Sequence, residues 1–458
     1  MHGRGKRTVP TIYIVLKQNL RQNNRSGRTI LMFGSLFFLL ALGLPVAFAC
    51  GSVGIVFTAI VQGPMAVNLV PTRTFGLMVN YLLAAIPLFI FMACILEQSG
   101  IINRLYETVY QWIGGIKGGV ASATVAACAI LAAMTGVIGA SVVTMGVIAL
   151  PEMLKRHYNK YMSCGAIVAG GTLGILIPPS VLLIVYGLVD NSSIGKLYAG
   201  CILPGFMLAG LFIAYISLRC WINPSLGPPV PREDRVSLKE RVKMLASLIG
   251  PFIIIFLVLG TIFTGVAAPT EAAGVGALGA MILTGLQKQL SLRGVLNASE
   301  QTLKASAMVL WTMFGANIFV SLYVMSGGGR FVSNILLETG LGPYGVILIM
   351  QAILIFLGAF IDWTGIVMLT VPIFGPIIRQ LGFDPVWFGV LFATNLQISF
   401  LSPPFGYALF YLKGVAPPSI KTTDIWWGAA PFIALQVLGV GLLLVFPKIA
   451  TVLPDLLF

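Results

Sequence analysis

The sequence predicts an all-α polytopic membrane protein made of two inverted repeats, and two observations lead to that prediction. The first is composition: 58% of the 458 residues are hydrophobic and only 9% are charged, whereas about a quarter of the residues of a soluble protein are charged. Apolar runs such as residues 30–49 and 250–265 recur along the chain, and runs of this kind cross a bilayer core of about 30 Å. The second observation is a repeated pair of prolines.

The proline pairs mark matching places in two halves of the chain. Pro178 and Pro403 each open a Pro-Pro pair inside an apolar stretch, and they are 225 positions apart. Further landmarks recur in the same order at separations of 224, 221 and 227 positions: Pro45 and Pro269, Pro151 and Pro372, Ser99 and Ser326. We divide the chain into a basic N-terminal segment (1–29), a first repeat (30–218), a connector (219–243), a second repeat (244–450) and a C-terminal tail (451–458).

The distribution of Lys and Arg orients these repeats. Basic residues are concentrated in segments 154–160, 219–243 and 287–304, which we place in the cytoplasm because basic loops favour that side of a membrane. The loops that are poor in Lys and Arg are placed outside: 66–74, 190–196, 264–270 and 326–345. Each half then crosses the membrane about five times, and an odd number inverts the second half relative to the first, as in many secondary transporters.

The N-terminal segment 1–29 conflicts with this map, because it carries seven basic residues and no acid. Five crossings per half would put this end outside, against the tendency of basic segments. Two explanations stay open. Either residues 11–20 lie along the membrane interface, or one span between residues 30 and 65 is miscounted.

Charge, cysteine and histidine content exclude several classes of protein. The net charge of +14 lies in loops beside the spans, where it fixes orientation and meets anionic lipid rather than nucleic acid. The six cysteines are scattered singly and are interpreted as packing residues. Two histidines and scattered acids do not supply the clustered groups of a metal site or an acid–base centre, so we do not expect an enzyme.

Each Pro-Pro pair predicts a break in a membrane-spanning helix. Proline removes a backbone N–H and clashes with the preceding turn, so the helix stops inside the bilayer. The freed carbonyl groups must then meet protein, water or a cation. A single proline is compatible with a simple kink, but two breaks at matching positions favour a binding site.

A re-entrant hairpin is predicted before each break. Residues 120–153 hold two short apolar arms around "MTGVIGAS", with basic residues at both ends, so this hairpin enters from the cytoplasmic side. Residues 353–376 hold the matching arms around Asp362 and Thr364, and this hairpin enters from outside. Glu271 is expected at a helix start, where the helix dipole stabilises an acid.

Polar residues near the second break are the candidate substrate contacts. Asp362 is an isolated acid at membrane depth, where a carboxylate usually faces a cavity or a partner. It either faces the substrate or forms structural hydrogen bonds with the hairpin tip. Two roles stay open for the polar residues of the second broken span: they contact a polar substrate, or they form hydrogen bonds between helices. These residues are Asn395, Gln397, Ser399 and Ser402. The candidate substrate residues are Asp362, Thr364, Asn395 and Gln397.

Several motifs resemble the large membrane subunit of TRAP (tripartite ATP-independent periplasmic) transporters over about residues 30–450. These are "GGTLGILIPPS", "GAFIDWTG", "APTEAAGVG", "PLFIFMACILEQSGI" and "NLQISFLSPPFGYALFYLKGVAPP". The resemblance implies a multi-pass, sodium-driven elevator carrier of the bacterial inner membrane. It also implies two partners, a small four-helix membrane subunit on a separate chain and a soluble periplasmic binding protein that delivers organic acids.

The resemblance implies two Na⁺ sites, each where a hairpin tip meets the broken span behind it. The first is expected to use Thr135, Ile138, Gly174, Ile177 and Pro178. The second is expected to use Gly358, Ser399, Ser402 and Phe405. Several of these residues would contribute backbone carbonyl groups. The first tip has fewer hydroxyl groups than the Ser-rich tip common in the family, so the choice between Thr135 and Ser141 stays open.

The leading hypothesis is therefore Na⁺-coupled uptake of a small organic acid such as a dicarboxylate or a keto acid. The alternative is an uncoupled channel or a scaffold subunit of a membrane complex. A channel requires a continuous polar path, whereas this sequence concentrates its polarity in two breaks at mid-depth. The sequence does not identify which organic acid is carried.

Overall fold

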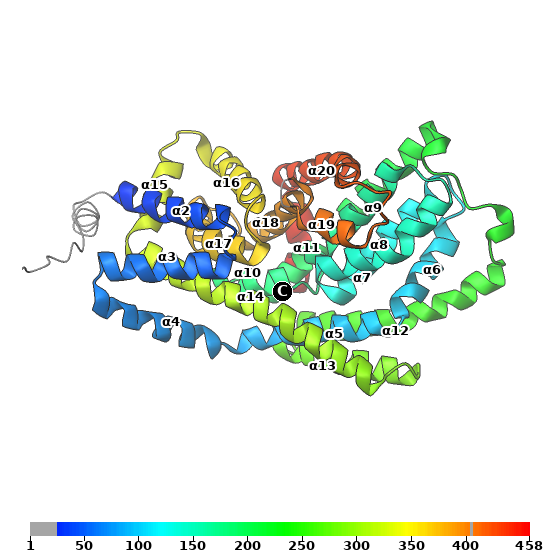
Figure 1. The fold of residues 1–458 in the computed structure, drawn as a ribbon, viewed down its shortest axis with the longest axis horizontal. Coiled ribbons are helices and arrows are strands. Elements are labelled where there is room, and N and C mark those ends of the chain that lie inside the picture. Colours follow the sequence, from blue (N-terminus) through cyan, green and yellow to red (C-terminus); the bar gives the residue numbers. More distant parts are fainter. Residues whose placement is uncertain (1–24, 404–405) are drawn as a thin grey trace, which may run out of the picture.

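The structure, a computed structural model, describes residues 25–403 and 406–458. The predicted N-terminal segment therefore lies almost wholly outside the described residues, as does Phe405. Every regular element in the described part of the chain is a helix, as Figure 1 shows, so the predicted all-α class is confirmed.

The elements of the first half are short and long helices joined by brief turns. Their bounds are α2 Arg25–Ala41, α3 Val46–Val61, η1 Pro64–Asn68, α4 Leu69–Met78, η2 Tyr81–Ala84, α5 Ala85–Gln98, α6 Ile101–Ile113, α7 Gly119–Thr135, α8 Ile138–Lys155, α9 Lys160–Thr172, η3 Leu173–Ile175, α10 Val181–Asp190 and α11 Ile194–Ile222.

The connector and the second half follow. Their bounds are η4 Pro224–Leu226, η5 Arg232–Asp234, α12 Leu238–Phe263, α13 Pro269–Leu286, α14 Leu292–Met325, α15 Gly328–Leu337, α16 Gly342–Gly358, α17 Trp363–Gln380, α18 Pro385–Leu401, α19 Tyr407–Val415, α20 Thr422–Val445 and α21 Lys448–Leu457. The predicted C-terminal tail is thus largely part of a helix.

Six segments of the described chain are long and apolar enough to cross a bilayer. They are Tyr81–Gln98, α8, α11, α12, α14 and α20. Shorter apolar helices, including α3, α7, α10, α16 and α18, lie between them. A polytopic membrane protein accounts for both groups, since hairpins and broken spans are built from helices too short to cross alone. The number of crossings in each half stays a prediction.

Helices of the second half recur at the spacing of the proline pairs. Helix α17 begins and ends 225 positions after α8, and α18 begins 225 positions after α9. The starts of this second pair are also capped alike. Asn159 accepts hydrogen bonds from the first turn of α9, and Asp384 does the same for α18. Such caps satisfy the free N–H groups at a helix start. The correspondence is what a repeat requires, while the inverted orientation of the halves in a membrane stays a prediction.

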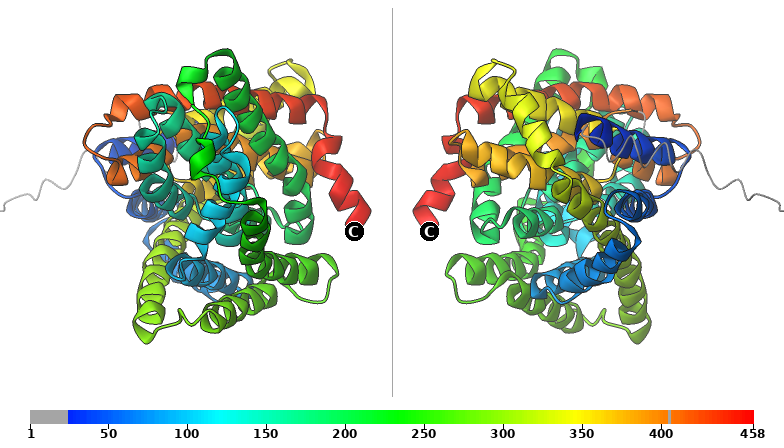
Figure 2. Two further views of the ribbon diagram at one scale, coloured as in Figure 1. Left: turned by 90° about the vertical axis from the view of Figure 1, so that its right-hand side faces the viewer. Right: turned by 90° about the vertical axis from the view of Figure 1, so that its left-hand side faces the viewer.

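The hairpins and broken helices are interleaved between the halves. Helices α3, α4, α5, α12, α13 and α14 run along one side of the molecule (Figure 1). Hairpin α7–α8 and hairpin α16–α17 lie towards opposite ends, with α10, α18 and α19 between them (Figure 1). Helix α8 of the first hairpin packs against α19, which follows the second break, and α17 packs against α10, which follows the first. Two side views show the long helices α12, α13 and α14 framing one edge of this assembly (Figure 2).

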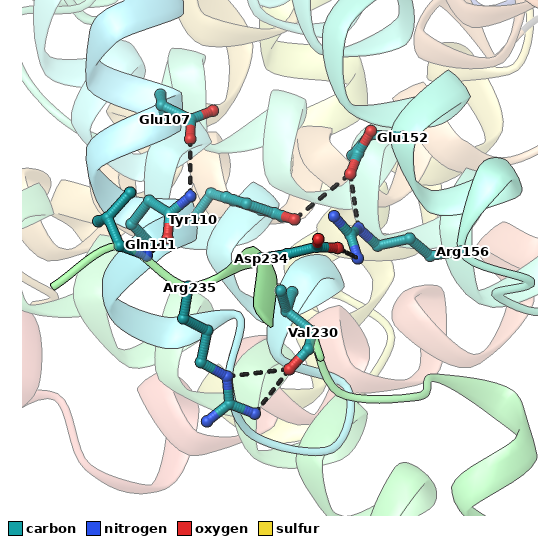
Figure 3. A network of polar contacts seen from close by, with 9 residues as sticks. Glu107, Tyr110, Gln111, Glu152, Arg156, Val230, Asp234 and Arg235 are labelled. Atoms are coloured by element: carbon teal, nitrogen blue, oxygen red, sulfur yellow. Dashed lines mark hydrogen bonds and ion pairs between the residues drawn. The ribbon is translucent and has the colours of Figure 1, made fainter. Parts of the chain in front are cut away.

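Polar contacts tie the connector to the first hairpin (Figure 3). Of the predicted connector (219–243), residues 223–237 lie between the end of α11 and the start of α12. Arg156, just after α8, bonds to Glu152 at 2.5 Å and to Asp234 of the connector at 3.0 Å. Arg235 donates to the carbonyl oxygen of Val230 at 2.6 Å. The bond between Arg156 and Asp234 holds the end of α8 against the connector, while the other two bonds order the end of α8 and the connector themselves.

Two smaller predictions are also confirmed. Glu271 lies in the first turn of α13, where its carboxylate accepts a hydrogen bond of 2.8 Å from the backbone N–H of Ala268. All six cysteines are buried and none forms a disulfide, as expected of packing residues.

Candidate functional site

The first break lies between α9 and α10. Helix α9 ends at Thr172, η3 adds one turn, and residues 176–180 then run without regular structure to the start of α10 at Val181. Every residue from 171 to 180 is buried. The sequence explains the interruption, because Pro178 and Pro179 cannot donate the hydrogen bonds that would continue the helix.

The tip of the first hairpin lies directly against this break. Gly136 has φ +61°, and a Cβ atom added to it would lie 2.5 Å from the carbonyl oxygen of Pro179. A Cβ atom added to Gly174 would lie 3.2 Å from the carbonyl oxygen of Val137. Glycine therefore permits backbone-to-backbone contact at both places. The structure brings together the tip and the break that were expected to form the first Na⁺ site.

Hydroxyl groups surround this contact. Thr135 donates to the carbonyl oxygen of Leu131 at 3.0 Å, and its oxygen lies 3.5 Å from that of Ser141. Thr135 and Ser141, between which the sequence left the choice of ligand open, are therefore neighbours. The side chain of Ile177 packs against Gly205 of α11, and because that side chain is a hydrocarbon, only the backbone of Ile177 can contribute a polar group.

The second tip and the second break make a similar contact. A Cβ atom added to Gly358, the last residue of α16, would overlap the side chain of Ser399 in α18. The hydroxyl of Ser399 donates to the carbonyl oxygen of Leu354 at 3.4 Å, and that of Ser402 donates to Ile398 at 2.7 Å. Three of the four residues expected at the second Na⁺ site are thus close together, and Phe405 lies outside the described residues.

A cavity of about 210 Å³ lies where the two tip–break contacts approach each other. One wall is formed by the first tip and the start of α8, at residues 136–140, and by the start of α10. Another is formed by the second tip at Asp362 and Trp363, and by residues on either side of the second break. Helices α5 and α14 close the remaining side. The cavity therefore lies between the two hairpin tips, and Ile138 is the one described residue of the predicted Na⁺ sites that lines it.

The charged groups on the cavity wall are acidic. Glu97 of α5 and Asp362 line it, whereas none of its described lining residues is Lys or Arg. Asp362 caps α17 by accepting a hydrogen bond of 3.0 Å from the N–H of Thr364, which is the structural role considered for it, while its contact with a substrate stays a prediction. Glu97 accepts a hydrogen bond of 3.3 Å from the hydroxyl of Thr144.

Four helices begin at the cavity wall: α8, α10, α17 and α19. Among the described residues, no side chain is hydrogen-bonded as a cap at the starts of α8, α10 and α19. The first N–H groups of a helix have no partner within it and carry partial positive charge. These three helix starts therefore offer donors and a favourable potential for an anion, although no basic side chain is described there.

The other predicted substrate residues do not line the cavity. Asn395 donates to the carbonyl oxygen of Gln351 at 3.0 Å, and the buried Thr364 is not among the lining residues. Gln397 accepts a bond of 3.1 Å from Thr172. Asn395 and Gln397 are fully buried and bond between helices, which was the alternative considered for them.

The bond between Thr172 and Gln397 joins matching positions of the two halves, 225 residues apart. Gln436 of α20 donates to Thr172 at 3.1 Å. Three fully buried side chains thus connect α9 and α18, the two helices that break.

Sequence reasoning missed several residues of the cavity wall, namely Glu97, Gln301, Trp363, Tyr407 and Tyr411. Glu97 alone left a signal, because it is the only charged residue of the apolar helix α5 and acids within a span are usually functional. The remaining four have no such mark in the sequence.

Comparison with known proteins identifies the family. The family model described as "Tripartite ATP-independent periplasmic transporter, DctM component" matches residues 33–449. An ectoine/5-hydroxyectoine TRAP transporter large permease of Ruegeria pomeroyi is 34% identical, over 82% of this chain and 86% of its own. A C4-dicarboxylate TRAP transporter large permease of Rhodobacter capsulatus is 29% identical, over 93% and 99%.

Among solved structures, the YdaH transporter of Alcanivorax borkumensis has a similar fold. The TM-score is 0.61 at 15% identity, and the match covers 90% of this chain and 98% of that one. At this identity the likeness concerns the fold alone. The family match spans most of the chain, and the chain therefore belongs to the DctM component family of the tripartite ATP-independent periplasmic transporters.

Proposed function

We propose that this permease carries out Na⁺-coupled uptake of a small organic acid, with the cavity between the two hairpin tips as its substrate site. The observation that supports this most is the set of three uncapped helix starts at the cavity wall. A substrate carboxylate accepts hydrogen bonds from their free N–H groups, and their dipoles stabilise its charge. Discontinuous helices bind anionic substrates in this way in other secondary transporters.

Na⁺ binds at the two tip–break contacts in this proposal. Broken membrane helices expose backbone carbonyl oxygens, which coordinate Na⁺ in carriers of this general kind. Close approach at Gly136 and Gly174 brings two backbone segments near enough to share one ion, and Gly358 lies against the side chain of Ser399. Hydroxyl oxygens of Thr135, Ser141 and Ser399 are further ligands of the type a hard cation prefers. Each ion would lie beside the cavity, where it also attracts the substrate carboxylate.

Movement is proposed to follow an elevator mechanism. The hairpin of each half packs against the helix that follows the break of the other half, and Thr172 and Gln397 bond between the halves. These contacts support a single rigid body that contains both ion sites and the substrate. Such a body would slide past helices α5 and α14, which close the cavity on one side.

Two partners and a bacterial inner-membrane location complete the proposal. The family description names a tripartite, periplasmic system, which requires more than one chain. A small four-helix membrane subunit and a periplasmic binding protein are the partners expected. Permeases similar to this chain are named for C4-dicarboxylate, sialic acid, ectoine and isethionate transport, so a panel of these compounds is a suitable first set of substrates.

Uptake into proteoliposomes tests the proposal. The chain is reconstituted with its small subunit, and the binding protein and each radiolabelled compound are added outside. We expect saturable uptake of at least one compound that requires an inward Na⁺ gradient and the binding protein. Flux of every panel compound that is unchanged when K⁺ replaces Na⁺ would instead support an uncoupled channel.

A further inference from the structure

We propose that Glu97 and Thr144 form the gate through which substrate leaves this permease, and that the route beyond the gate is a second, polar cavity beside α6 and α8. This inference rests on the proposed function, because the gate closes the same substrate cavity. It follows from two cavities that border one side of α8 and from the hydrogen bond that lies between them.

The second cavity has a volume of about 590 Å³ and lies between α6, the end of α8 and the connector. Charged side chains line it: Arg104, Glu107, Glu152, Arg156 and Asp234. Figure 3 shows Glu152, Arg156 and Asp234 directed towards one another here. Arg104, Glu107 and Asp234 are exposed, so the cavity reaches the surface on the side of the connector, which is predicted to be cytoplasmic. We call this second cavity the vestibule.

The vestibule is suited to the passage of a polar solute. Ionisable side chains in a membrane protein usually face one another or a water-filled space. The vestibule is larger than the substrate cavity of about 210 Å³, so it has room for a molecule that leaves that cavity. Its described lining holds three acids and two arginines, so a departing carboxylate meets no surplus of positive charge that would retain it.

Helix α8 borders both cavities. Ala140 lines the substrate cavity, whereas Ile148 and Glu152 line the vestibule. Side chains spaced by four residues form a continuous ridge on a helix, and the ridge from Ala140 to Ile148 is about 12 Å long at 1.5 Å per residue. Thr144 is the residue midway along this ridge, and it lines neither cavity.

The chain from α5 to α6 forms the facing wall. Glu97, near the end of α5, lines the substrate cavity, and Arg104 of α6 lines the vestibule. The two walls meet where the hydroxyl of Thr144 donates to the carboxylate of Glu97 at 3.3 Å. They meet again further along, where Tyr110 donates to Glu152 at 3.3 Å. The bond between Glu97 and Thr144 therefore lies between the substrate cavity and the vestibule.

This bond also joins the parts of the molecule that the proposed elevator moves relative to each other. Helix α5 packs against α13 and α14, whereas α8 packs against α9 and α19. Sliding of the first hairpin along α5 must break the bond between Glu97 and Thr144. The passage between the two cavities is thereby coupled to the movement, as a gate requires.

Cysteines on either side of Thr144 test the gate. Ala140→Cys places a thiol in the substrate cavity, and Ile148→Cys places one in the vestibule. A membrane-impermeant thiol reagent is added to inside-out vesicles, which expose the cytoplasmic face, and to intact cells. Peptide mass spectrometry assigns the labelled position, because native Cys94 also lines the substrate cavity. We expect Ile148→Cys to react at least tenfold faster than Ala140→Cys in the vesicles and not to react in cells.

Thr144→Val keeps the size of the side chain and removes the hydroxyl, so it should speed labelling of Ala140→Cys at least fivefold and leave that of Ile148→Cys unchanged. Thr144→Ser, which keeps the donor, is the matched control and should label as the parent does. Glu97→Leu and Glu97→Gln repeat the comparison on the other wall, since the amide oxygen of glutamine still accepts the bond. A purely structural role would lower the melting temperature without separating the two cysteines.

Three results would overturn the inference. They are equal labelling of both cysteines with Glu97 and Thr144 intact, labelling of Ile148→Cys in cells alone, and unchanged labelling of Ala140→Cys in folded Thr144→Val. If Thr144→Val does not fold, unchanged labelling in Glu97→Leu decides. Uptake by the wild type separates the two proposals: any of these results beside Na⁺-coupled uptake removes the gate alone, whereas uptake of every compound without Na⁺ dependence removes the proposed function.

Discussion

Replacing Gly358 by Ala places a methyl group between the second hairpin tip and the second broken helix. The added Cβ atom would overlap the side chain of Ser399, and Gly358 is not among the glycines with positive φ. The backbone therefore accepts alanine, and the clash alone forces the tip away from α18. Over-packing of this kind costs roughly 1–3 kcal/mol. If that cost falls on the ion-bound state, Na⁺ affinity falls about 5- to 150-fold, since 1.4 kcal/mol corresponds to tenfold.

The assay is the Na⁺ concentration that gives half-maximal uptake in proteoliposomes, measured beside the melting temperature of the purified chain. Gly274→Ala in α13 is the control, because nothing lies within 4 Å of its added Cβ atom. The double variant Gly358→Ala with Ser399→Gly restores the space and removes the hydroxyl. We expect it to recover packing without recovering Na⁺ affinity. An unchanged Na⁺ requirement in Gly358→Ala would refute the placement of an ion at this contact.

Further predictions concern the first break, the bond between the halves, the topology and the partners. Replacing both Pro178 and Pro179 by Ala removes about 3 kcal/mol of helix penalty per proline, so the helix should close over the carbonyl groups and weaken Na⁺ dependence before it lowers expression. Gln397→Leu removes the hydrogen bonds to the buried side chains of Thr172 and Gln436. Such a bond stabilises a membrane protein by about 1–2 kcal/mol, so the variant should have a lower melting temperature. Two introduced cysteines are tested with a membrane-impermeant reagent in intact cells: Gly329→Cys in the first turn of α15 should be labelled, and the exposed Glu233→Cys of the connector should be spared; the reverse pattern contradicts the inverted map. The chain without its small subunit should not transport, and full uptake by the single chain would contradict that expectation.

The sequence was sufficient to locate the breaks and hairpins because proline and glycine act locally. Single prolines such as Pro151 and Pro204 lie inside helices α8 and α11, but at the pair Pro178–Pro179 two successive backbone donors are missing and the helix stops. The predicted hairpins of residues 120–153 and 353–376 fall within the helix pairs α7–α8 and α16–α17. The spacing of 225 residues between the two Pro-Pro pairs was visible for the same reason, and α17 and α18 begin 225 positions after α8 and α9; that the two halves form a repeat stays a prediction.

The roles of individual polar residues could not be read in the same way. Asn395 and Gln397 are two positions apart in α18, and residues so spaced on a helix point in different directions. Which direction faces a cavity depends on where α16 and α20 pack, and both side chains are used for bonds to those helices. Glu97 is the opposite case, a residue that was not predicted for the site but lies at the cavity wall. It becomes part of the cavity only because α5 lies against the first hairpin, and no local pattern encodes that contact.

The central claim is that Na⁺ and the organic acid cross the membrane together. Simultaneous influx of ²²Na⁺ and a ¹⁴C-labelled substrate into proteoliposomes, with the small subunit and the binding protein present, tests it most directly. We predict that each labelled species accelerates entry of the other, because coupling between two ligands is reciprocal, and that Gly358→Ala reduces both fluxes together. Entry of the acid without accompanying Na⁺, at a rate that Gly358→Ala leaves unchanged, would contradict the account.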